Sequence, residues 1–503
     1  MSFPILTFIT FVPILGAVII LAVAKEKETL IKLIGIATTF VCLLLSLLIL
    51  TQFNAQNPDF QMQEKLSWIP ALNVNYYMGV DGISVPMVLL TALLSFLAAI
   101  ASWNIGPRVK EYWVLYLLLE TGMLGTFVSL DLFLFYIFWE LMLVPMYFLI
   151  GIWGGPRKEY AAIKFFLYTL GGSVFMLVGF LALYFASMPH TFSIPELAAQ
   201  AQNLTNALNR TLSFFRFGGA QLVFLALFLG FAIKVPVFPF HTWLPDAHVE
   251  APTPISVILA GILLKMGTYG FYRISHPILP QSARDFAIMF AVLGIIGIIY
   301  GAFVAMAQQD FKKLVAYSSV SHMGFILLGM SAFTVAGWNG GYFQMFSHGL
   351  LTGGMFLLVG VLYDRAHTRD LNAFGGLGAK IPLYAGMLMV ISLGSLGLPG
   401  MSGFVSEFMV LLGVYTTFPV YTIIAVIGIV LTAGYILYML QRILLGPFNE
   451  KWSHLTEINN RELVTLIPLI ILTILIGVYP ALLLNLINPT MTALLTSIGG
   501  IVP

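Results

Sequence analysis

Long apolar segments dominate this sequence and restrict what the chain can fold into. A bilayer core about 30 Å thick is crossed by roughly 20 apolar helical residues, and fourteen windows of about that length are bounded by charges, proline or glycine. They cover 3–22, 31–52, 82–103, 112–130, 132–153, 160–187, 219–243, 254–275, 285–307, 312–333, 342–363, 382–415, 420–441 and 463–487. Because backbone groups in lipid must bond within the protein, the windows predict an all-α polytopic membrane protein with about 14 transmembrane helices.

Composition excludes a water-soluble enzyme and a chain that carries its own redox centre. Of 503 residues, 59% are hydrophobic and only 9% are charged, far from the usual soluble balance. Cys42 is the sole cysteine, which excludes disulfides, thiolate zinc sites and iron–sulfur clusters held by this chain alone. We therefore expect no cofactor in this chain and assign any redox chemistry to partners. The longest segments between windows, about 53–81 and 188–218, are expected to be outer-side loops.

The distribution of lysine and arginine predicts the orientation, because these residues collect in cytoplasmic loops. Fifteen occupy odd-numbered loops: Lys25, Lys27, Lys32, Arg108, Lys110, Arg157, Lys158, Lys312, Lys313, Arg365, Arg369, Lys380, Arg442, Lys451 and Arg461. Five occupy even-numbered loops: Lys65, Arg210, Arg216, Arg273 and Arg284. The asymmetry places both termini outside the cytoplasm.

Charged residues inside predicted spans are the candidates for function. They are Glu120, Glu140, Lys164, Lys234, Lys265 and Glu407. An isolated charge at the centre of a membrane helix costs about 2.5–3.5 kcal/mol, so these groups must be paired or hydrated. Glu140 follows Asp131 by nine residues, about 13 Å along a helix, which is near mid-depth. A functional and a structural role stay open for Glu120 and for Lys164.

Two of these charges lie beside predicted helix breaks. Pro236 and Pro239 follow Lys234 in the seventh window, and the twelfth window contains the sequence LPGMSG at 398–403, just before Glu407. Proline removes a backbone donor and breaks a helix, and broken helices at membrane depth are tolerated where they line protein or a wet cavity. We therefore predict that helices 7 and 12 are broken at functional positions.

The order of the windows also fits two inverted five-helix repeats. Residues 1–111 would form spans 1–3, residues 112–275 the first repeat (spans 4–8), residues 285–441 the second (spans 9–13), and 442–503 the last span, all in a single domain. Glu140 then corresponds to His322, and Lys234 to Glu407. Two half-sites related in this way suit alternating opening toward opposite faces.

One polar cluster resembles a metal site in composition only. His241, Asp246, His248 and Glu250 follow the seventh window in a proline-rich turn. Their residue types are those of metal ligands, but we expect a hydrogen-bonded turn on the outer side and no metal.

Four segments carry a resemblance to a known family. They are 138–147 (FWELMLVPMY), 234–248 (KVPVFPFHTWLPDAH), 259–267 (LAGILLKMG) and 314–324 (LVAYSSVSHMG). The chain resembles the antiporter-like subunits of respiratory complex I, with relatives in multisubunit Na⁺/H⁺ antiporters and membrane-bound hydrogenases. Glu407, in the segment LPGMSGFVSEF at 398–408, is similar to the M-type members, whereas other members carry lysine there.

The resemblance implies a function and roles for single residues. It implies a proton-translocating subunit of a bacterial inner-membrane NADH-quinone oxidoreductase, next to L-type and N-type neighbours, with FMN, iron–sulfur clusters and quinone in partner subunits. Glu140 and Lys234 would form a modulating pair, Lys265 the central relay and Glu407 the terminal protonatable group. His322 and His348 would connect them. A redox-independent Na⁺/H⁺ antiporter or a membrane-bound hydrogenase is the alternative.

Overall fold

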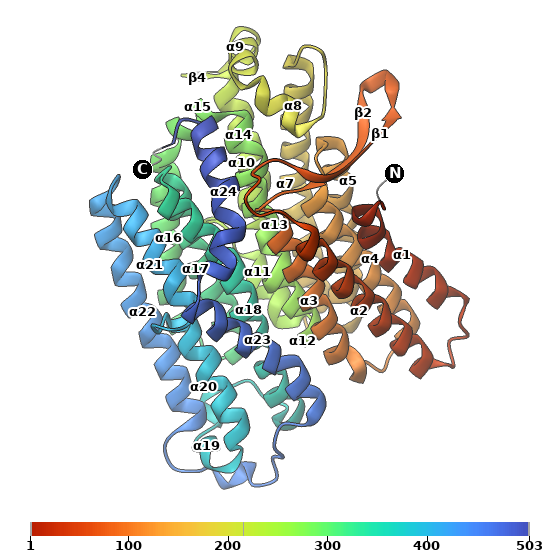
Figure 1. Ribbon diagram of the computed structural model, residues 1–503. Helices are drawn as coiled ribbons and strands as arrows, with labels where there is room; N and C mark the ends of the chain where they lie inside the picture. Colours follow the sequence, from red (N-terminus) through yellow and green to blue (C-terminus); the bar gives the residue numbers. More distant parts are fainter. Residues whose placement is uncertain (1–2, 215, 501–503) are drawn as a thin grey trace.

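The chain folds into a bundle of helices that accounts for most of its described residues (Figure 1). The computed structural model describes residues 3–214 and 216–500. Within them, eleven helices are long and apolar enough to cross a membrane, and four shorter apolar helices accompany them. An all-α, multi-pass membrane fold is thus confirmed. The number of crossings and the division into two inverted repeats remain predictions.

Every predicted window contains one or more helices. The first part contains α1 (Ile5–Ala22), α2 (Glu28–Gln52), α3 (Val85–Ala101), α4 (Val109–Val128), α5 (Leu132–Leu141), α6 (Leu143–Trp153), α7 (Lys158–Ala186), α8 (Ile194–Ala199), α9 (Ala201–Thr211), α10 (Gly219–Lys234), α11 (Trp243–Glu250), α12 (Thr253–Ile258) and α13 (Leu264–Gly270). Two π-helical turns, η3 (Leu259–Leu263) and η4 (Phe271–Ser275), lie on either side of α13.

The second part continues the bundle. It contains α14 (His276–Ile278), α15 (Pro280–Asp285), α16 (Ala287–Met306), α17 (Phe311–Ser331), α18 (Val335–Ala366), α19 (Leu377–Lys380), α20 (Pro382–Leu396), α21 (Ser402–Tyr415), α22 (Pro419–Leu444), α23 (Asn460–Val478) and α24 (Ala481–Ser497). Short 3₁₀ turns are η1 (Pro70–Leu72), η2 (Ser102–Asn104), η5 (Leu371–Ala373) and η6 (Glu450–Trp452).

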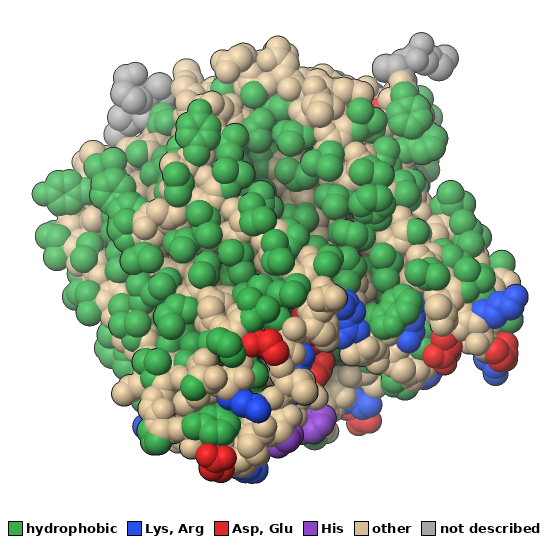
Figure 2. Space-filling model, turned by 60° about the horizontal axis from the view of Figure 1, so that its bottom comes forward, with side chains coloured by type: hydrophobic (Ala, Val, Ile, Leu, Met, Phe, Trp, Pro, Cys, Tyr) green, Lys and Arg blue, Asp and Glu red, His purple; other side chains and the backbone are tan. Residues whose placement is uncertain are grey.

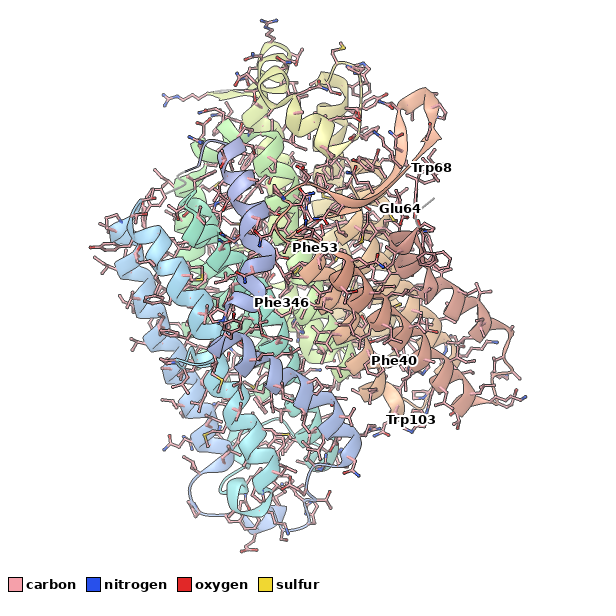
Figure 3. The ribbon with its side chains drawn as sticks, in the orientation of Figure 1. Phe40, Phe53, Glu64, Trp68, Trp103 and Phe346 are labelled. Carbon is pink, nitrogen blue, oxygen red and sulfur yellow. The ribbon has the colours of Figure 1, made fainter. Side chains whose placement is uncertain are left out.

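A β-hairpin occupies most of the segment expected to be a plain loop at 53–81. Strands β1 (Gln61–Ile69) and β2 (Val74–Val80) pair antiparallel around Asn73, whose φ of 51° closes the turn. Glu64 of β1 accepts hydrogen bonds from the backbone N–H groups of Leu6 (2.8 Å) and Thr7 (3.0 Å), so it satisfies donors that the start of α1 leaves free. Figure 3 labels Glu64 at the hairpin, close to the start of that helix.

One end of the bundle carries the extramembrane structure. The β1–β2 hairpin, α8, α9 and a small hairpin of β3 (Ser213–Phe214) and β4 (Phe217–Gly218) lie together at the top of Figure 1, toward which the end of α24 also points. We call this the hairpin end. The opposite end carries α19, and charged side chains gather along it in Figure 2, while hydrophobic side chains cover the flank.

Both predicted breaks are present, and their causes are local. Helix α10 ends at Lys234, directly before the segment with Pro236 and Pro239, and the chain resumes as α11. Helices α20 and α21 are separated by a turn in which Gly397 (φ 85°) and Gly400 (φ 90°) adopt left-handed backbone angles. Glycine adopts these angles without a steric penalty.

Two further breaks were not predicted. The fifth window is divided at Met142, between α5 and α6, because Pro145 has no N–H to donate to the preceding turn. The window 463–487 is divided at Tyr479 and Pro480, between α23 and α24, so it does not form one straight span. Helix α24 instead continues to the hairpin end of the bundle (Figure 1).

Candidate functional site

Lys265 of α13 and His348 of α18 are in direct contact inside the bundle. The Lys265 ammonium Nζ lies 2.6 Å from His348 Nδ1 and 2.5 Å from the carbonyl oxygen of Ala260. Lys265 is 0% exposed and His348 is 2% exposed. Ala260 belongs to the π-helical turn η3, a type of irregularity that occurs often at functional sites. The π-helical turn therefore supplies one acceptor for the Lys265 ammonium, and the His348 imidazole supplies the other.

A second histidine and a carboxyl group continue from this contact. The rings of His348 and His322 have centroids 5.7 Å apart. His322 Nδ1 lies 3.3 Å from Glu407 Oε1, and His322 Nε2 lies 3.2 Å from the Ser395 hydroxyl. Three helices therefore supply one polar cluster: α17 carries His322, α18 carries His348 and α21 carries Glu407.

A small cavity lies within this cluster. Its lining includes His322, His348, Ser395 and Glu407. The cavity measures about 10 Å³, and roughly 10–15 Å³ is the minimum space for one water molecule. Polar groups on several sides provide the partners that such a water needs. A single water can therefore bridge the gap between the two histidine rings.

The break between α20 and α21 positions Glu407. Gly397 in that turn lies against the carboxyl group, since a Cβ built on Gly397 would be 3.1 Å from Glu407 Oε2. Glu407 follows the break by one helical turn and is 3% exposed. The left-handed turn thus allows the backbone to approach the carboxylate closely.

Glu140 and Lys234 lie near each other but do not form a contact ion pair. The Lys234 ammonium is positioned over the rings of Trp139 (5.4 Å) and Phe165 (5.5 Å). Among the described residues, no hydrogen-bond acceptor reaches Lys234 Nζ. Glu140 interacts with Lys234 only through longer-range electrostatics. A buried cation held by aromatic faces is weakly fixed compared with a paired one, so small movements of Glu140 change its environment strongly.

Close helix packing joins the Lys234 break to the Lys265 helix. A Cβ on Gly267, two residues after Lys265, would lie 2.7 Å from the Phe231 carbonyl and 3.1 Å from the Val235 backbone nitrogen. The absence of a side chain at Gly267 lets α13 pack on the end of α10. Contacts thus join Lys265, His348, His322 and Glu407, while Lys234 is buried on the helix packed against α13 and Glu140 is half-buried. The roles of all six residues in proton transfer remain predictions.

Glu120 and Lys164 lie apart from this region. Glu120 in α4 is 0% exposed and lies near the thiol of Cys42 in α2. No nitrogen or oxygen atom of the described residues forms a hydrogen bond with either oxygen of its carboxyl group. Lys164 forms an ion pair with Asp246 at 2.8 Å. Lys164 is therefore a partner of the polar turn that follows Lys234.

The turn with His241, Asp246, His248 and Glu250 is placed differently from our expectation. Asp246 pairs with Arg157 at 3.1 Å, and Glu250 accepts a hydrogen bond from the Arg157 backbone N–H at 2.9 Å. Arg157 belongs to an odd-numbered loop, so the turn lies at the end of the bundle that the lysine and arginine distribution assigns to the cytoplasm. Our expectation of an outer-side turn does not agree with that distribution. Among the described residues, no three His, Cys, Asp or Glu side chains lie close enough together to hold a metal ion. Asp246 and Glu250 instead serve as partners of Arg157.

Three charged or polar residues were missed by the sequence analysis. Lys312, counted there as a loop cation, is 4% exposed in the first turn of α17. Arg273, also counted as a loop cation, is buried in η4 and pairs with Asp81 at 2.5 Å. His248 is fully buried and stacks on Phe356 with a centroid distance of 4.6 Å. Burial of charges at helix ends has no distinct sequence signal, which explains why the first two were assigned to loops.

Comparison with known proteins identifies the family. Residues 129–432 match the family model described as NADH:quinone oxidoreductase/Mrp antiporter, TM, and residues 8–128 match the amino-terminal model of NADH-ubiquinone oxidoreductase chain 4. NADH-quinone oxidoreductase subunit M of Rhodobacter capsulatus is 43% identical over 496 residues, covering 97% of this chain and 96% of that protein.

Solved structures agree with this assignment. A chain of respiratory complex I from Thermus thermophilus superimposes with a TM-score of 0.88 at 30% identity, covering 98% of this chain and 100% of that chain. A chain of the Mrp complex from Dietzia sp. DQ12-45-1b shares the fold, with a TM-score of 0.84 at 23% identity, covering 99% of this chain and 100% of that chain. The chain therefore belongs to the family of membrane subunits common to NADH:quinone oxidoreductases and Mrp antiporters.

Proposed function

We propose that this chain is a proton-translocating membrane-arm subunit of an NADH-quinone oxidoreductase. The observation that carries the proposal is the buried row of Lys265, His348, His322 and Glu407, which links α13 to the broken twelfth span. Ionisable residues inside a membrane bundle are expensive and mark ion pathways. The relative from Rhodobacter capsulatus carries the name NADH-quinone oxidoreductase subunit M, which supports the redox-coupled version of this role.

Each group in the row is suited to pass a proton to the next. The Lys265 ammonium can donate to His348 Nδ1 across 2.6 Å, and donation leaves a neutral amine. The proton then moves from His348 to His322 through a water in the small cavity. His322 delivers it to Glu407 across 3.3 Å. Histidine suits this task because it both accepts and donates near neutral pH.

Glu140 and Lys234 are proposed to drive the row by changing their separation. A carboxylate close to Lys234 stabilises the protonated ammonium, and withdrawal of the carboxylate in an apolar site destabilises it. Lys234 has no direct hydrogen-bond partner among the described residues, and besides its burial the charge of Glu140 acts on it. Lys234 would then release its proton, and the proton would be passed toward Lys265.

The proposal assigns the electron-transfer chemistry to partners. FMN, iron–sulfur clusters and quinone would be held by other subunits, and L-type and N-type antiporter-like subunits would be the membrane neighbours. Apolar side chains on the flanks are exposed, for example Phe185 (67%) on α7 and Val430 (67%) on α22, which suits contact with lipid or with other membrane subunits. The chain would lie in a bacterial inner membrane, with both termini on the periplasmic side, as the lysine and arginine distribution predicts.

The alternative is a subunit of a redox-independent Na⁺/H⁺ antiporter or of a membrane-bound hydrogenase. The observation that supports this alternative is the fold that the chain shares with a chain of the Mrp complex. Glu407 favours the first proposal, because lysine at this place is typical of many antiporter relatives.

Purification of the native assembly distinguishes these classes. The chain would be tagged, extracted gently from its own membranes, and assayed for bound flavin, iron–sulfur absorbance and NADH-quinone activity. We expect all three, with activity coupled to proton movement once the assembly is returned to vesicles. A colourless, redox-inactive assembly that exchanges Na⁺ for H⁺ would contradict the proposal.

A further inference from the structure

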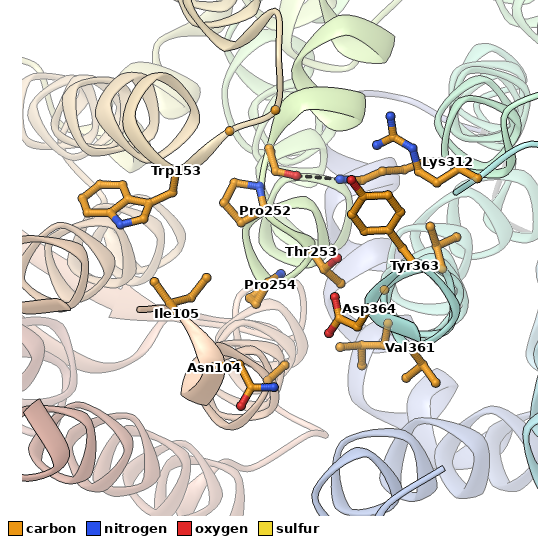
Figure 4. A pocket seen from close by; sticks show the side chains of 18 of the residues that line it. Asn104, Ile105, Trp153, Pro252, Thr253, Pro254, Lys312, Val361, Tyr363 and Asp364 are labelled. Atoms are coloured by element: carbon orange, nitrogen blue, oxygen red, sulfur yellow. Dashed lines mark hydrogen bonds between the residues drawn. The ribbon is translucent and has the colours of Figure 1, made fainter. Parts of the chain in front are cut away.

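A cavity with both charged and apolar lining residues opens at the end of the bundle opposite the hairpin. It measures about 370 Å³ and lies between the ends of α3 and α6 on one side and α18 and α23 on the other. Figure 4 shows Lys312, Thr253 and Asp364 on one side of this space, and Trp153 and Asn104 on the other. We call this cavity the vestibule. It is not adjacent to the small cavity between His322 and Glu407, so it forms a separate feature.

Most charges around the vestibule already have partners. Arg369 pairs with Asp310 at 3.1 Å, and Glu462 pairs with Arg365 at 2.7 Å. Arg461 donates to the side chain of Asn104 at 2.6 Å. Asp364, in contrast, makes no hydrogen bond or ion pair within 4.0 Å to the described residues and is exposed within the cavity. A space of this size with unpaired carboxylate oxygens is suited to water.

Lys312 forms the buried wall of the vestibule. Its side chain enters from the first turn of α17, and its ammonium donates to the backbone carbonyls of Ala251 (2.5 Å) and Val249 (3.5 Å). No carboxylate of the described residues lies within 4.0 Å of this ammonium. The charged groups that face it at longer range are Asp310, Glu250 and Asp364, and also Arg369. An ammonium has three donors, so one remains directed away from the two carbonyls.

His248 lies beyond Lys312, toward the proton row. It precedes Val249, whose carbonyl accepts from Lys312, and both of its ring nitrogens lack a hydrogen-bond partner among the described residues. Its ring stacks on Phe356 of α18 with a centroid distance of 4.6 Å, and both Lys312 and Lys265 act on it electrostatically. Buried imidazole nitrogens without partners are uncommon in stable cores. An unpartnered imidazole thus follows directly from the segment whose carbonyls hold Lys312.

We propose that the vestibule is the proton-uptake entrance and that Lys312 is its proton-loading residue, which passes protons to Lys265 by way of His248. The inference rests on the proposed proton-translocating function. A hydrated proton in the vestibule binds the neutral Lys312 amine. The resulting ammonium transfers the proton to His248, which transfers it to the Lys265 amine. Lys312 and His248 are then neutral again, and Lys265 holds the proton until it donates it to His348. No oxidant or reductant is needed.

A purely structural role for Lys312 makes a different prediction. In that case the ammonium serves only to hold the carbonyls of Ala251 and Val249 between α11 and α12, and any permanent cation of similar reach would serve. Arginine is such a cation, because it stays protonated under all accessible conditions. Histidine is shorter but releases its proton near neutral pH. Arginine and histidine at position 312 therefore separate proton transfer from anchoring.

The test uses the complete complex reconstituted in vesicles, with NADH-driven acidification and NADH-quinone turnover measured per mole of bound flavin. We expect Lys312→Arg and Lys312→Gln to lower both rates about tenfold or more, as for loss of a proton-transfer group, and Lys312→His to restore a substantial part. The matched control is Lys313, the next residue on α17, where Lys313→Arg and Lys313→Gln should stay within about twofold of the parent. Parent-like rates in Lys312→Arg would overturn the inference.

A second measurement keeps the inference testable if Lys312 variants assemble poorly. In a Cys42→Ser background, Asp364→Cys places a thiol in the vestibule. We expect a membrane-impermeant, positively charged thiol reagent to react from one face only and to slow proton uptake. Reaction without any effect on proton uptake would contradict the entrance role. If Glu407→Gln lost proton translocation while Lys312→Arg kept the parent rate, only the entrance role of the vestibule would be rejected. If Glu407→Gln also kept the parent rate of proton translocation, the proposed function itself would be rejected.

Discussion

The Lys265 ammonium and the His348 imidazole share a 2.6 Å contact in the middle of the bundle. The ammonium is otherwise held by the Ala260 carbonyl of a π-helical turn. This arrangement fixes the lysine without pairing it with a carboxylate. A buried lysine that is bonded only to neutral groups loses less when it gives up its proton than one in an ion pair, which suits a relay more than a structural anchor.

Glu407→Gln should block the end of the proton row. The amide keeps the size of the side chain and can still bond to His322, but it cannot take up a proton. We expect NADH-driven proton translocation to fall about tenfold or more, since loss of a group in acid–base transfer has effects of roughly 10²–10⁴-fold. The measurement is acidification of vesicles by the purified complex. Glu450→Gln, at an exposed position at the end of the bundle opposite the hairpin, is the control, and equal rates in the two variants would contradict the role of Glu407.

Gly397→Ala should disturb Glu407 in a way that Gly400→Ala does not. Both glycines have left-handed φ angles, 85° and 90°, so each alanine carries a backbone penalty of about 1–2 kcal/mol. Only at Gly397 would the new methyl group lie 3.1 Å from Glu407 Oε2, while nothing lies within 4 Å at Gly400. We expect similar heat stability for the two variants but slower proton translocation in Gly397→Ala alone. Equal proton rates would show that the close approach is unimportant.

Asp81→Asn should destabilise the complex because it leaves Arg273 without its charge partner. The pair is buried, with 2.5 Å between Asp81 Oδ1 and Arg273 Nη2, and removal of one partner of a buried pair costs about 3–5 kcal/mol. The double variant Asp81→Asn/Arg273→Met should recover part of the loss. The measurement is the temperature at which the subunit dissociates or aggregates.

A surface pair supplies the control for that experiment. Arg108 and Glu111 are exposed and 3.5 Å apart, and such pairs contribute about 0–1 kcal/mol. Glu111→Gln should therefore leave the dissociation temperature almost unchanged. If Asp81→Asn behaved like Glu111→Gln, the buried pair would be unimportant for stability.

The predicted orientation can be tested with single cysteines, because Cys42 is the sole native cysteine and is buried. In a Cys42→Ser background, Asp59→Cys near the hairpin should react with a membrane-impermeant maleimide in intact cells stripped of their outer envelope. Glu450→Cys at the opposite end should react only in inverted vesicles. The reverse pattern would place the termini in the cytoplasm.

Helix positions and buried charges could be predicted from the sequence because both follow from the cost of polar groups in lipid. Windows of apolar residues, with proline next to Lys234 and the LPG segment before Glu407, were sufficient to locate the two breaks. The same reasoning identified Lys265 and Glu407, whereas His348, which contacts Lys265, was indicated by the family resemblance. Their function was indicated by family resemblance and not by pattern.

Other features depend on packing that a linear pattern does not contain. The π-helical turn at Leu259–Leu263 has an ordinary apolar sequence. Lys312 lies at a helix start, where cations are usually solvated, and only the three-dimensional fold shows that α11 and α12 cover it. The break at Tyr479 and Pro480 had a visible signal in Pro480 but was obscured by the apolar residues on both sides.

Replacement of Lys265 is the most direct test of the central claim. Lys265→Met keeps the length and apolar character of the side chain, fits a buried site, and removes the only group at that position able to carry a proton. Lys380→Met, at an exposed position, is the control. Proton translocation and NADH-quinone turnover would be measured in vesicles at equal content of bound flavin. The account predicts that proton translocation is lost in Lys265→Met and kept in Lys380→Met, whereas a parent-like proton rate in Lys265→Met would contradict it.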